Sequence, residues 1–191
     1  MRAIILRHGD TFTPGEPLRR IGARTNLPLV ASGHEQARAL EEHFTATCFD
    51  RCLVSPLTRT RETAAIVAPY VVAEPTEWLR EIDPGPDEGR FETEVTARIG
   101  ADALTAWERD AVQPPGWIVD APTRIAAWRA FFAETEGTVL IVTSNGAARF
   151  ALLALGLPPA KLRTGAYGEI ADAQVMAWDV RPPRLAKAPL R

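Results

Sequence analysis

The chain opens on a short apolar run, Ala3 to Leu6, that passes directly into Arg7, His8 and Gly9. A continuous apolar run of this length is typical of a strand buried on both faces, as in the parallel sheets of α/β proteins. Such sheets bind ligands at the carboxyl ends of their strands, which is where Arg7 and His8 stand. Gly9 allows the backbone to approach a ligand closely. From these residues alone, His8 is explained equally well as a nucleophile or as a polar side chain bonded to a backbone carbonyl.

Composition and charge exclude several classes of partner. The chain has 191 residues, is 46% hydrophobic and carries a formal net charge of −2, which argues against nucleic acid or an anionic membrane as the main partner. We find no basic and apolar leader and no run of membrane-spanning length, so we expect a cytoplasmic protein. Cys48 and Cys52 lack a second pair of ligands, so two reduced thiols are expected rather than a zinc site. We expect no metal and no cofactor, and the oligomeric state is not indicated.

Strands and helices alternate along the rest of the chain. Further strands are expected at 51–54, 71–73, 138–143, 167–170 and 174–179, and helices at 32–45, from 56 onward, and at 92–111, 121–136 and 147–155. This alternation predicts a single α/β domain over 1–191, with a mostly parallel central sheet flanked by helices on both faces. A helical cap is expected to be inserted at about 84–122, with Trp117 as a wall of the pocket. The basic, proline-rich end after 180 is expected to have no regular structure.

Three residues define the expected helix ends. Ser32, with Glu35 three residues later, has the spacing of a capping box, and Ser55 before Pro56 is typical of a helix start. Gly137 is expected to be the C-cap of the helix that precedes the strand at 138–143.

The first turn of the second helix contains Arg59, in an unusual place for a cation. The helix dipole is positive at this end, so a cation is unfavourable there unless an anion is bound. A surface ion pair with Glu62 is the alternative explanation. The long polar loop 12–32 adds Arg24, which could face an anionic substrate, whereas its other arginines are explained by solvation.

An acidic loop at 77–89, rich in proline and glycine, supplies two candidate proton donors, Glu81 and Asp83. Loops of this kind often lie over an active site, and a carboxyl group can protonate a leaving oxygen. A solvated acidic turn explains the later carboxylates of this loop better than it explains Glu81.

Three apolar strands end in polar turns that begin helices or loops, at 7–9, 55–59 and 144–146. In a parallel sheet these ends meet at one edge. Two arginines, a histidine, the amide of Asn145 and a helix N-terminus would then surround one point, which suits a dianionic phosphoryl group.

These motifs resemble those of the histidine phosphatase superfamily, also called phosphoglycerate-mutase-like. The resemblance rests on Arg7-His8-Gly9-Asp10-Thr11, Pro28-Leu29 with Gly33, Ser55-Pro56-Leu57-Thr58-Arg59-Thr60, Leu79-Arg80-Glu81-Ile82-Asp83-Pro84-Gly85 and Val142-Thr143-Ser144-Asn145-Gly146. It covers most of the chain.

The resemblance implies a phosphohistidine mechanism. His8 would be the nucleophile, Arg7 and Arg59 the phosphate clamps, and Glu81 the proton donor, with Asp83 in reserve. Phosphate binding would also involve Thr11, Asn145, Gly146 and Arg24.

Two positions depart from the family pattern. Asn145 stands where the family commonly has a second histidine, and an amide can donate a hydrogen bond but carries no charge. Arg24 could supply the missing charge from the long loop. Pro14 takes the place of an asparagine that the family has just beyond the first motif.

The sequence therefore predicts a metal-independent phosphatase, of the histidine acid type, that acts on a small-molecule or peptide phosphate monoester. A mutase of the phosphoglycerate type is a second possibility, and we prefer the phosphatase because the short chain has little extra cap to shield a phosphorylated intermediate from water. A non-catalytic phospholigand-binding or scaffolding protein is the alternative of a different class. The sequence does not identify the substrate.

Overall fold

A computed structural model describes residues 1–183 and shows a six-stranded sheet in the order β3-β2-β4-β1-β5-β6. Strands β1, β2, β3 and β4 pair in parallel, whereas β5 pairs antiparallel with both β1 and β6. The strand bounds are Arg2–Arg7, Arg51–Val54, Ala73–Pro75, Thr138–Thr143, Tyr167–Ala171 and Gln174–Val180, for β1 to β6 in turn. The predicted α/β class and the mostly parallel sheet are confirmed.

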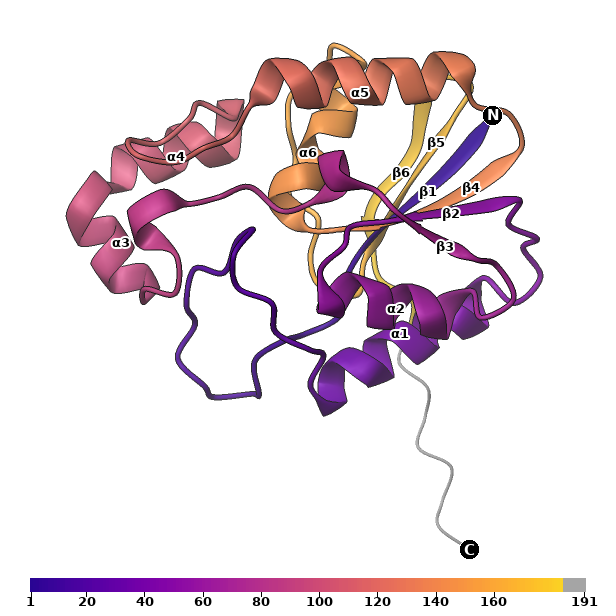
Figure 1. Ribbon diagram of the computed structural model, residues 1–191, viewed down its shortest axis with the longest axis horizontal. Coiled ribbons are helices and arrows are strands. Elements are labelled where there is room, and N and C mark those ends of the chain that lie inside the picture. Colours follow the sequence, from indigo (N-terminus) through magenta and orange to yellow (C-terminus); the bar gives the residue numbers. More distant parts are fainter. Residues whose placement is uncertain (184–191) are drawn as a thin grey trace, which may run out of the picture.

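Helices cover both faces of this sheet, as predicted (Figure 1). Helices α1 and α2 pack together on one face, and α5 and α6 pack together on the other. The helix bounds are Ala31–His43, Thr58–Val67, Glu92–Ile99, Ala101–Asp110, Ala121–Glu134 and Asn145–Ala154 for α1 to α6, with 3-10 turns η1 at Glu77–Leu79 and η2 at Gly85–Asp87.

The first strand is buried on both of its faces because its alternate side chains enter two different cores. Ala3 and Ile5 belong to the core beneath α5 and α6, whereas Ile4 and Leu6 belong to the core beneath α1 and α2. All four side chains are fully buried. This explains why the strand is a continuous apolar run rather than an alternating one.

The parallel pairing aligns three strand ends. Arg7 pairs with Thr143 across β1 and β4, and the next amide, that of His8, donates to the Thr143 carbonyl at 3.1 Å. On the other side of β4, the amide of Ser55 donates to the Val142 carbonyl at 3.0 Å. The residues that follow β1, β2 and β4 therefore meet at one edge of the sheet.

The first two helices begin elsewhere than predicted. The N-cap of α1 is Val30 and that of α2 is Leu57, and neither helix has a side-chain cap. The Ser32 hydroxyl instead donates to the Asp10 carboxylate at 3.3 Å, and Ser55 lies in the turn before α2. The capping predictions were wrong because tertiary contacts with the strand ends determine these turns.

Three other boundaries differ. The helix expected at 92–111 is two helices separated by Gly100, whose φ of +83° ends α3 and begins α4. Helix α5 has Thr135 as its C-cap, and Gly137 lies instead in the turn before β4. The third strand is Ala73–Pro75 rather than 71–73.

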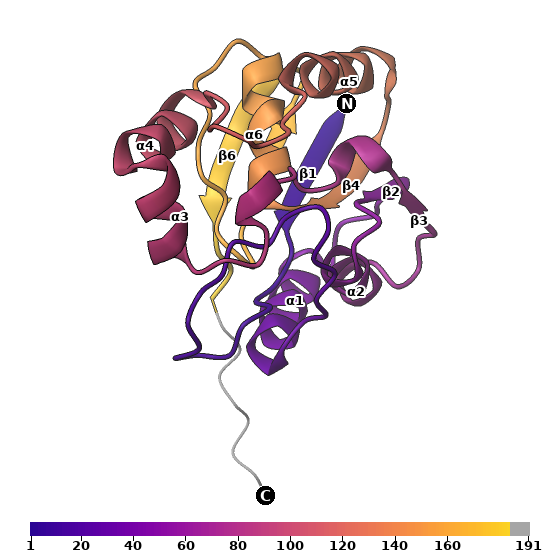
Figure 2. The same ribbon diagram turned by 60° about the vertical axis from the view of Figure 1, so that its left-hand side comes forward.

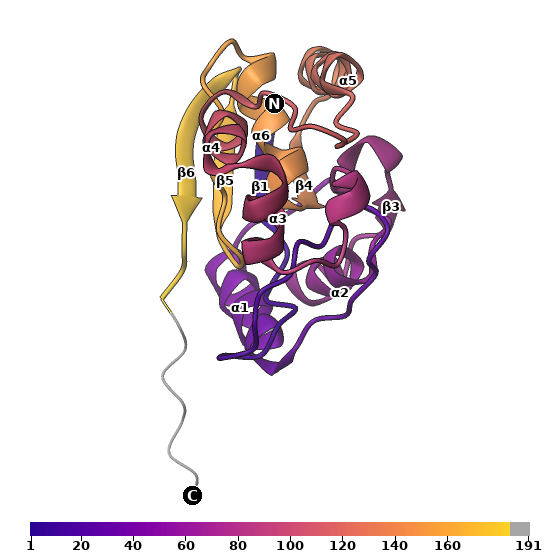
Figure 3. The same ribbon diagram turned by 90° about the vertical axis from the view of Figure 1, so that its left-hand side faces the viewer.

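Helices α3 and α4 lie to one side of the sheet, beside the long loop that follows β1 (Figures 2 and 3). An isolated bridge joins Arg19 to Phe91, and the Arg20 guanidinium pairs with the Glu92 carboxylate at 2.5 Å. These contacts join the long loop after β1 to the segment 84–122, which was expected to form a cap.

Within residues 1–183, no helix is long and apolar enough to cross a membrane. Cys48 and Cys52 are both free thiols. Most of the end that was expected to lack regular structure lies outside the described residues.

Gly33→Ala should destabilise the fold. A methyl group at Gly33 would lie 2.9 Å from the Asp10 amide nitrogen and closer still to its carbonyl oxygen, so α1 would have to move away from the end of β1. We expect the free energy of unfolding to fall by about 1–3 kcal/mol, measured by urea denaturation. Glu41→Ala on the exposed side of the same helix is the control, with a change within about 0.5 kcal/mol. Equal stability of the two variants would contradict this close contact.

Candidate active site

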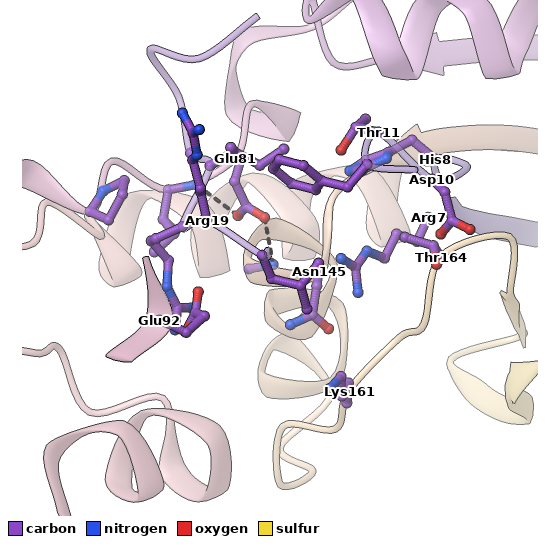
Figure 4. A pocket seen from close by; sticks show the side chains of 18 of the residues that line it. Arg7, His8, Asp10, Thr11, Arg19, Glu81, Glu92, Asn145, Lys161 and Thr164 are labelled. Carbon is purple, nitrogen blue, oxygen red and sulfur yellow. Dashed lines mark hydrogen bonds and ion pairs between the residues drawn. The ribbon is translucent and has the colours of Figure 1, made fainter. Parts of the chain in front are cut away.

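An open pocket with a volume of about 1230 Å³ lies at the edge where the three strand ends meet. Its walls come from the long loop, the segments around Glu81 and Trp107, the start of α6, and the loop at 159–164. Figure 4 shows Arg7, Glu81 and Asn145 pointing toward one another within it. The structure thus brings residues from distant parts of the sequence around one space.

His8 lies at the pocket with one ring nitrogen already bonded. Its side chain is 4% exposed, and Nδ1 is 2.7 Å from the Gly9 carbonyl oxygen. A nitrogen beside a carbonyl must carry the hydrogen, so Nδ1 donates and Nε2 keeps its lone pair. Burial, together with the positive charges of Arg59 and Arg7, holds the pKa of His8 well below its ordinary value. His8 is therefore a neutral imidazole with a free Nε2.

Arg7 provides a half-buried cation in the same pocket. Its Nη1 donates to the Leu162 carbonyl at 2.9 Å, and its buried Nε has no partner. Burial lowers the pKa of Arg7, and the nearby Glu81 carboxylate acts in the opposite direction. A guanidinium remains charged even so, because its pKa begins far above neutrality.

Arg59 is fully buried and is not part of the pocket lining. Its guanidinium donates to the carbonyls of Thr25 at 2.7 Å and of Gly22 at 3.2 Å, which ties down the long loop. The alternative ion pair with Glu62 is not formed, since that carboxylate accepts from the Leu29 amide at 2.7 Å. Arg59 therefore acts on the site through its charge, which lowers the pKa of His8.

Two backbone amides hold the Glu81 carboxylate. Oε1 accepts from the Ile82 amide at 2.8 Å and Oε2 from the Gly146 amide at 3.1 Å. Gly146 is required here because a Cβ at this position would overlap the Glu81 carboxylate. Gly146 was expected to bind phosphate, but its amide instead holds Glu81 at the pocket.

Asn145 is the first residue of α6 and lines the pocket. Its Oδ1 accepts from the Leu162 amide at 2.8 Å. The side-chain NH₂ group is thereby left to donate to a ligand. Thr11 also lines the pocket.

Two expected residues are not brought to this point. Arg24 is 57% exposed, pairs with Asp83 at 3.2 Å and is not part of the pocket lining, so it does not replace the charge that Asn145 lacks. Asp83 is likewise outside the pocket lining, whereas Glu81 lines the pocket together with His8 and Arg7.

The aromatic wall of the pocket differs from the prediction. Trp117 is buried and donates from Nε1 to the Asp87 carboxylate at 2.7 Å, so it is a core residue. Trp107 lines the pocket instead. Sequence reasoning also missed Lys161 and Glu108, which line the pocket but belong to no motif that could have identified them.

Among residues 1–183, no group of three or more histidine, cysteine, aspartate or glutamate side chains could hold a metal ion. The pocket lining carries several carboxylates, but the groups beside His8 include the guanidinium of Arg7 and the amide of Asn145. Such a set suits a phosphoryl group, whose oxygens accept hydrogen bonds from guanidinium and amide groups.

A neutral, buried histidine beside two arginines at the carboxyl edge of parallel strands defines a class of α/β proteins that bind and transfer phosphoryl groups. Within that class, the model of the histidine phosphatase superfamily (branch 1) matches residues 3–186. The chain belongs to this superfamily, and the resemblance seen in the sequence is confirmed.

Relatives of the chain include both mutases and phosphatases by name. A probable phosphoglycerate mutase GpmB from Enterobacter sp. (strain 638) is 31% identical over 173 residues, covering 83% of this chain and 76% of that protein. A probable 2-carboxy-D-arabinitol-1-phosphatase from Arabidopsis thaliana is 30% identical over 166 residues, covering 82% of this chain. The match covers only 33% of the plant protein, so this chain spans about a third of its length.

Solved structures share the fold. TTHB049 from Thermus thermophilus superposes with a TM-score of 0.72 at 27% identity, covering 93% of this chain and 98% of that one. A mycobacterial glucosyl-3-phosphoglycerate phosphatase superposes with a TM-score of 0.79 at 20% identity, covering 94% and 99%. The second likeness supports the fold alone.

The imidazole of His8 should stay neutral at a pH where an ordinary histidine is half protonated. Removing the charge of Arg59, as in Arg59→Met, should raise the pKa of His8 toward its usual value of about 6.5. The measurement is an NMR titration of the ring carbons.

Arg61→Met, at an exposed position of the same helix, is the control and should leave the titration of His8 unchanged. Protonation of wild-type His8 at or above pH of about 6.5 would contradict the electrostatic account.

Proposed function

We propose that this protein hydrolyses phosphate monoesters through a phosphohistidine intermediate on His8. The observation that carries the proposal is the neutral, buried imidazole, whose Nδ1 is fixed by the Gly9 carbonyl and whose Nε2 is free beside Arg7. A nucleophile needs a lone pair, and the flanking positive charges both preserve it and attract the phosphoryl oxygens.

In the first step, His8 Nε2 attacks phosphorus as the bond from phosphorus to the leaving oxygen breaks. Glu81 enters this step protonated and gives its proton to that oxygen, so the alcohol leaves neutral and Glu81 becomes the carboxylate that the Ile82 and Gly146 amides hold. Arg7 and the NH₂ group of Asn145 stabilise the charge on the transferring phosphoryl oxygens. Arg59 adds its charge from beneath the long loop.

In the second step, water attacks the phosphohistidine. The Glu81 carboxylate takes a proton from the water, the bond between phosphorus and Nε2 breaks, and inorganic phosphate leaves. Both His8 and Glu81 return to their starting protonation states, so the cycle consumes only ester and water. This sequence of steps uses no metal ion, and metal independence is part of the proposal.

The open pocket supports hydrolysis over mutase transfer. The pocket is open as well as large, which gives water access to a phosphorylated His8. A mutase must return the phosphoryl group to an alcohol before water reaches it. The relatives include proteins named as mutases and as phosphatases, and both reactions begin with transfer of a phosphoryl group.

The low pKa of His8 also supports the acid type of phosphatase. A lowered pKa means that the imidazole keeps its lone pair as the pH falls below about 6.5, so the nucleophile stays competent under mildly acidic conditions.

We also place the protein in the cytoplasm, which is supported by the two free thiols, Cys48 and Cys52.

The purified protein should release 4-nitrophenol from 4-nitrophenyl phosphate in the presence of a chelator. His8→Ala should reduce the rate to background because the variant lacks the nucleophile that accepts the phosphoryl group. Acid-labile phosphate should be trapped on the wild-type protein after rapid mixing with a radiolabelled ester.

Equal release by both proteins would contradict the role of His8, and loss of activity with the chelator would contradict metal independence. Binding of inorganic phosphate with no turnover and no phosphohistidine, across sugar phosphates, nucleotides, phosphorylated acids and phosphopeptides, would favour the scaffolding alternative.

Asn145→Asp should lower kcat/KM by about 100-fold. Aspartate keeps the oxygen that accepts from the Leu162 amide, but it replaces the NH₂ donor with a negative charge that repels phosphate. The melting temperature of Asn145→Asp should change little. Asn145→Ala loses both the bond to the Leu162 amide and the NH₂ donor, but it adds no negative charge, so it should lose less activity than Asn145→Asp. Equal activities of Asn145→Asp and the wild type would show that this side chain does not meet the phosphoryl group.

A further inference from the structure

The backbone that leads into Glu81 is held by side chains at three consecutive carbonyls. The carbonyls of Trp78 and Arg80 accept from one guanidinium, that of Arg124, at 3.1 and 2.7 Å. The Leu79 carbonyl between them accepts from the Thr143 hydroxyl at 2.6 Å. These carbonyls lie at the end of the short helix η1, where backbone acceptors lack helical partners.

Several contacts hold the Arg124 side chain in place. It lies near the start of α5, which packs over η1 (Figure 1). Its Nε donates to the Val119 carbonyl at 2.9 Å, and its guanidinium lies 5.9 Å from the centre of the Phe150 ring on α6. Three carbonyls on two segments thus determine the orientation of one half-buried cation.

Arg124 interacts with the Glu81 carboxylate through its charge, in addition to its hydrogen bonds with the backbone before Glu81. Burial lowers the pKa of Arg124, and the negative charge of Glu81 opposes that shift. Arg124 does not line the pocket, so it has no access to a bound ester. Its contacts with the Trp78 and Arg80 carbonyls and its charge both connect it to the site through Glu81.

We propose that Arg124 is a positioning residue that holds the Glu81 backbone, so that the carboxyl group reaches the leaving oxygen of the substrate. The inference rests on the proposed function. The Gly146 amide holds the carboxylate from the side of α6, and Arg124 holds its backbone from the side of α5. The two contacts together determine where the proton is delivered.

This role predicts a dependence on the leaving group that a general loss of stability would not produce. A nitrophenolate leaves without a proton, whereas an alkoxide needs one as its bond to phosphorus breaks. Misplacing Glu81 should therefore slow the hydrolysis of an alkyl phosphate much more than that of 4-nitrophenyl phosphate.

The experiment measures kcat/KM of Arg124→Met for glycerol phosphate and for 4-nitrophenyl phosphate. Methionine keeps much of the apolar stem and removes every donor. We expect the alkyl ester to lose about 100-fold and the aryl ester less than about threefold, because an error of about 1 Å in placing a catalytic group costs about 100-fold. Glu81→Gln should show the same selectivity, and Arg124→Lys, which keeps a charged donor, should recover part of the alkyl activity.

Arg129→Met is the matched control. Arg129 lies on the same helix and also donates to a backbone carbonyl, that of Ala154 at 3.3 Å, which is remote from the pocket lining. It should leave the ratio of the two activities unchanged. If Arg124→Met does not fold, Arg124→Lys carries the test through the same ratio.

An equal loss on both esters, or no loss on either, would overturn the positioning role while leaving the proposed function in place. Absence of turnover by the wild-type protein on both esters would overturn the proposed function itself, and the inference with it. The two failures are therefore distinguishable.

Discussion

The parallel pairing of β4 with both β1 and β2 is the constraint on which the site depends. Because parallel neighbours run in register, the amides of His8 and Ser55 bond to carbonyls at the end of β4. The turns after all three strands consequently open at one edge. Burial of β1 on both faces fixes this register, since a slip by one residue would exchange its side chains between the two cores and bring Arg2 or Arg7 into one of them.

The same edge brings together the buried Arg59 and the half-buried Arg7, and the fold satisfies both with backbone carbonyls. Arg7 bonds to Leu162, Arg59 bonds to Gly22 and Thr25, and neither is neutralised by a direct ion pair. A buried charge is costly unless it is hydrogen-bonded, and here the bonds leave the net charge intact. Burial, together with these positive charges, lowers the pKa of His8, and the charges make the pocket suitable for a dianion.

Glycines make the close approaches that this arrangement needs. Gly33 lets α1 reach the end of β1, and Gly146 leaves room for the Glu81 carboxylate over the start of α6. The carboxylate thus belongs to a different segment from the helix that binds it. Its placement depends on the packing of α5 and α6 against η1 rather than on any local motif.

The sequence by itself determined the fold class, the family, and the association of Arg7, His8 and Asn145 with one edge of the sheet. Apolar runs and strand-end motifs carry that information because they are local in the chain. The tertiary structure decided that Arg59 lies beneath the loop, that Arg24 pairs with Asp83, and that Trp107 rather than Trp117 lines the pocket. These outcomes depend on which distant carbonyls and carboxylates come within reach once the chain is packed, and no spacing in the sequence encodes such partners.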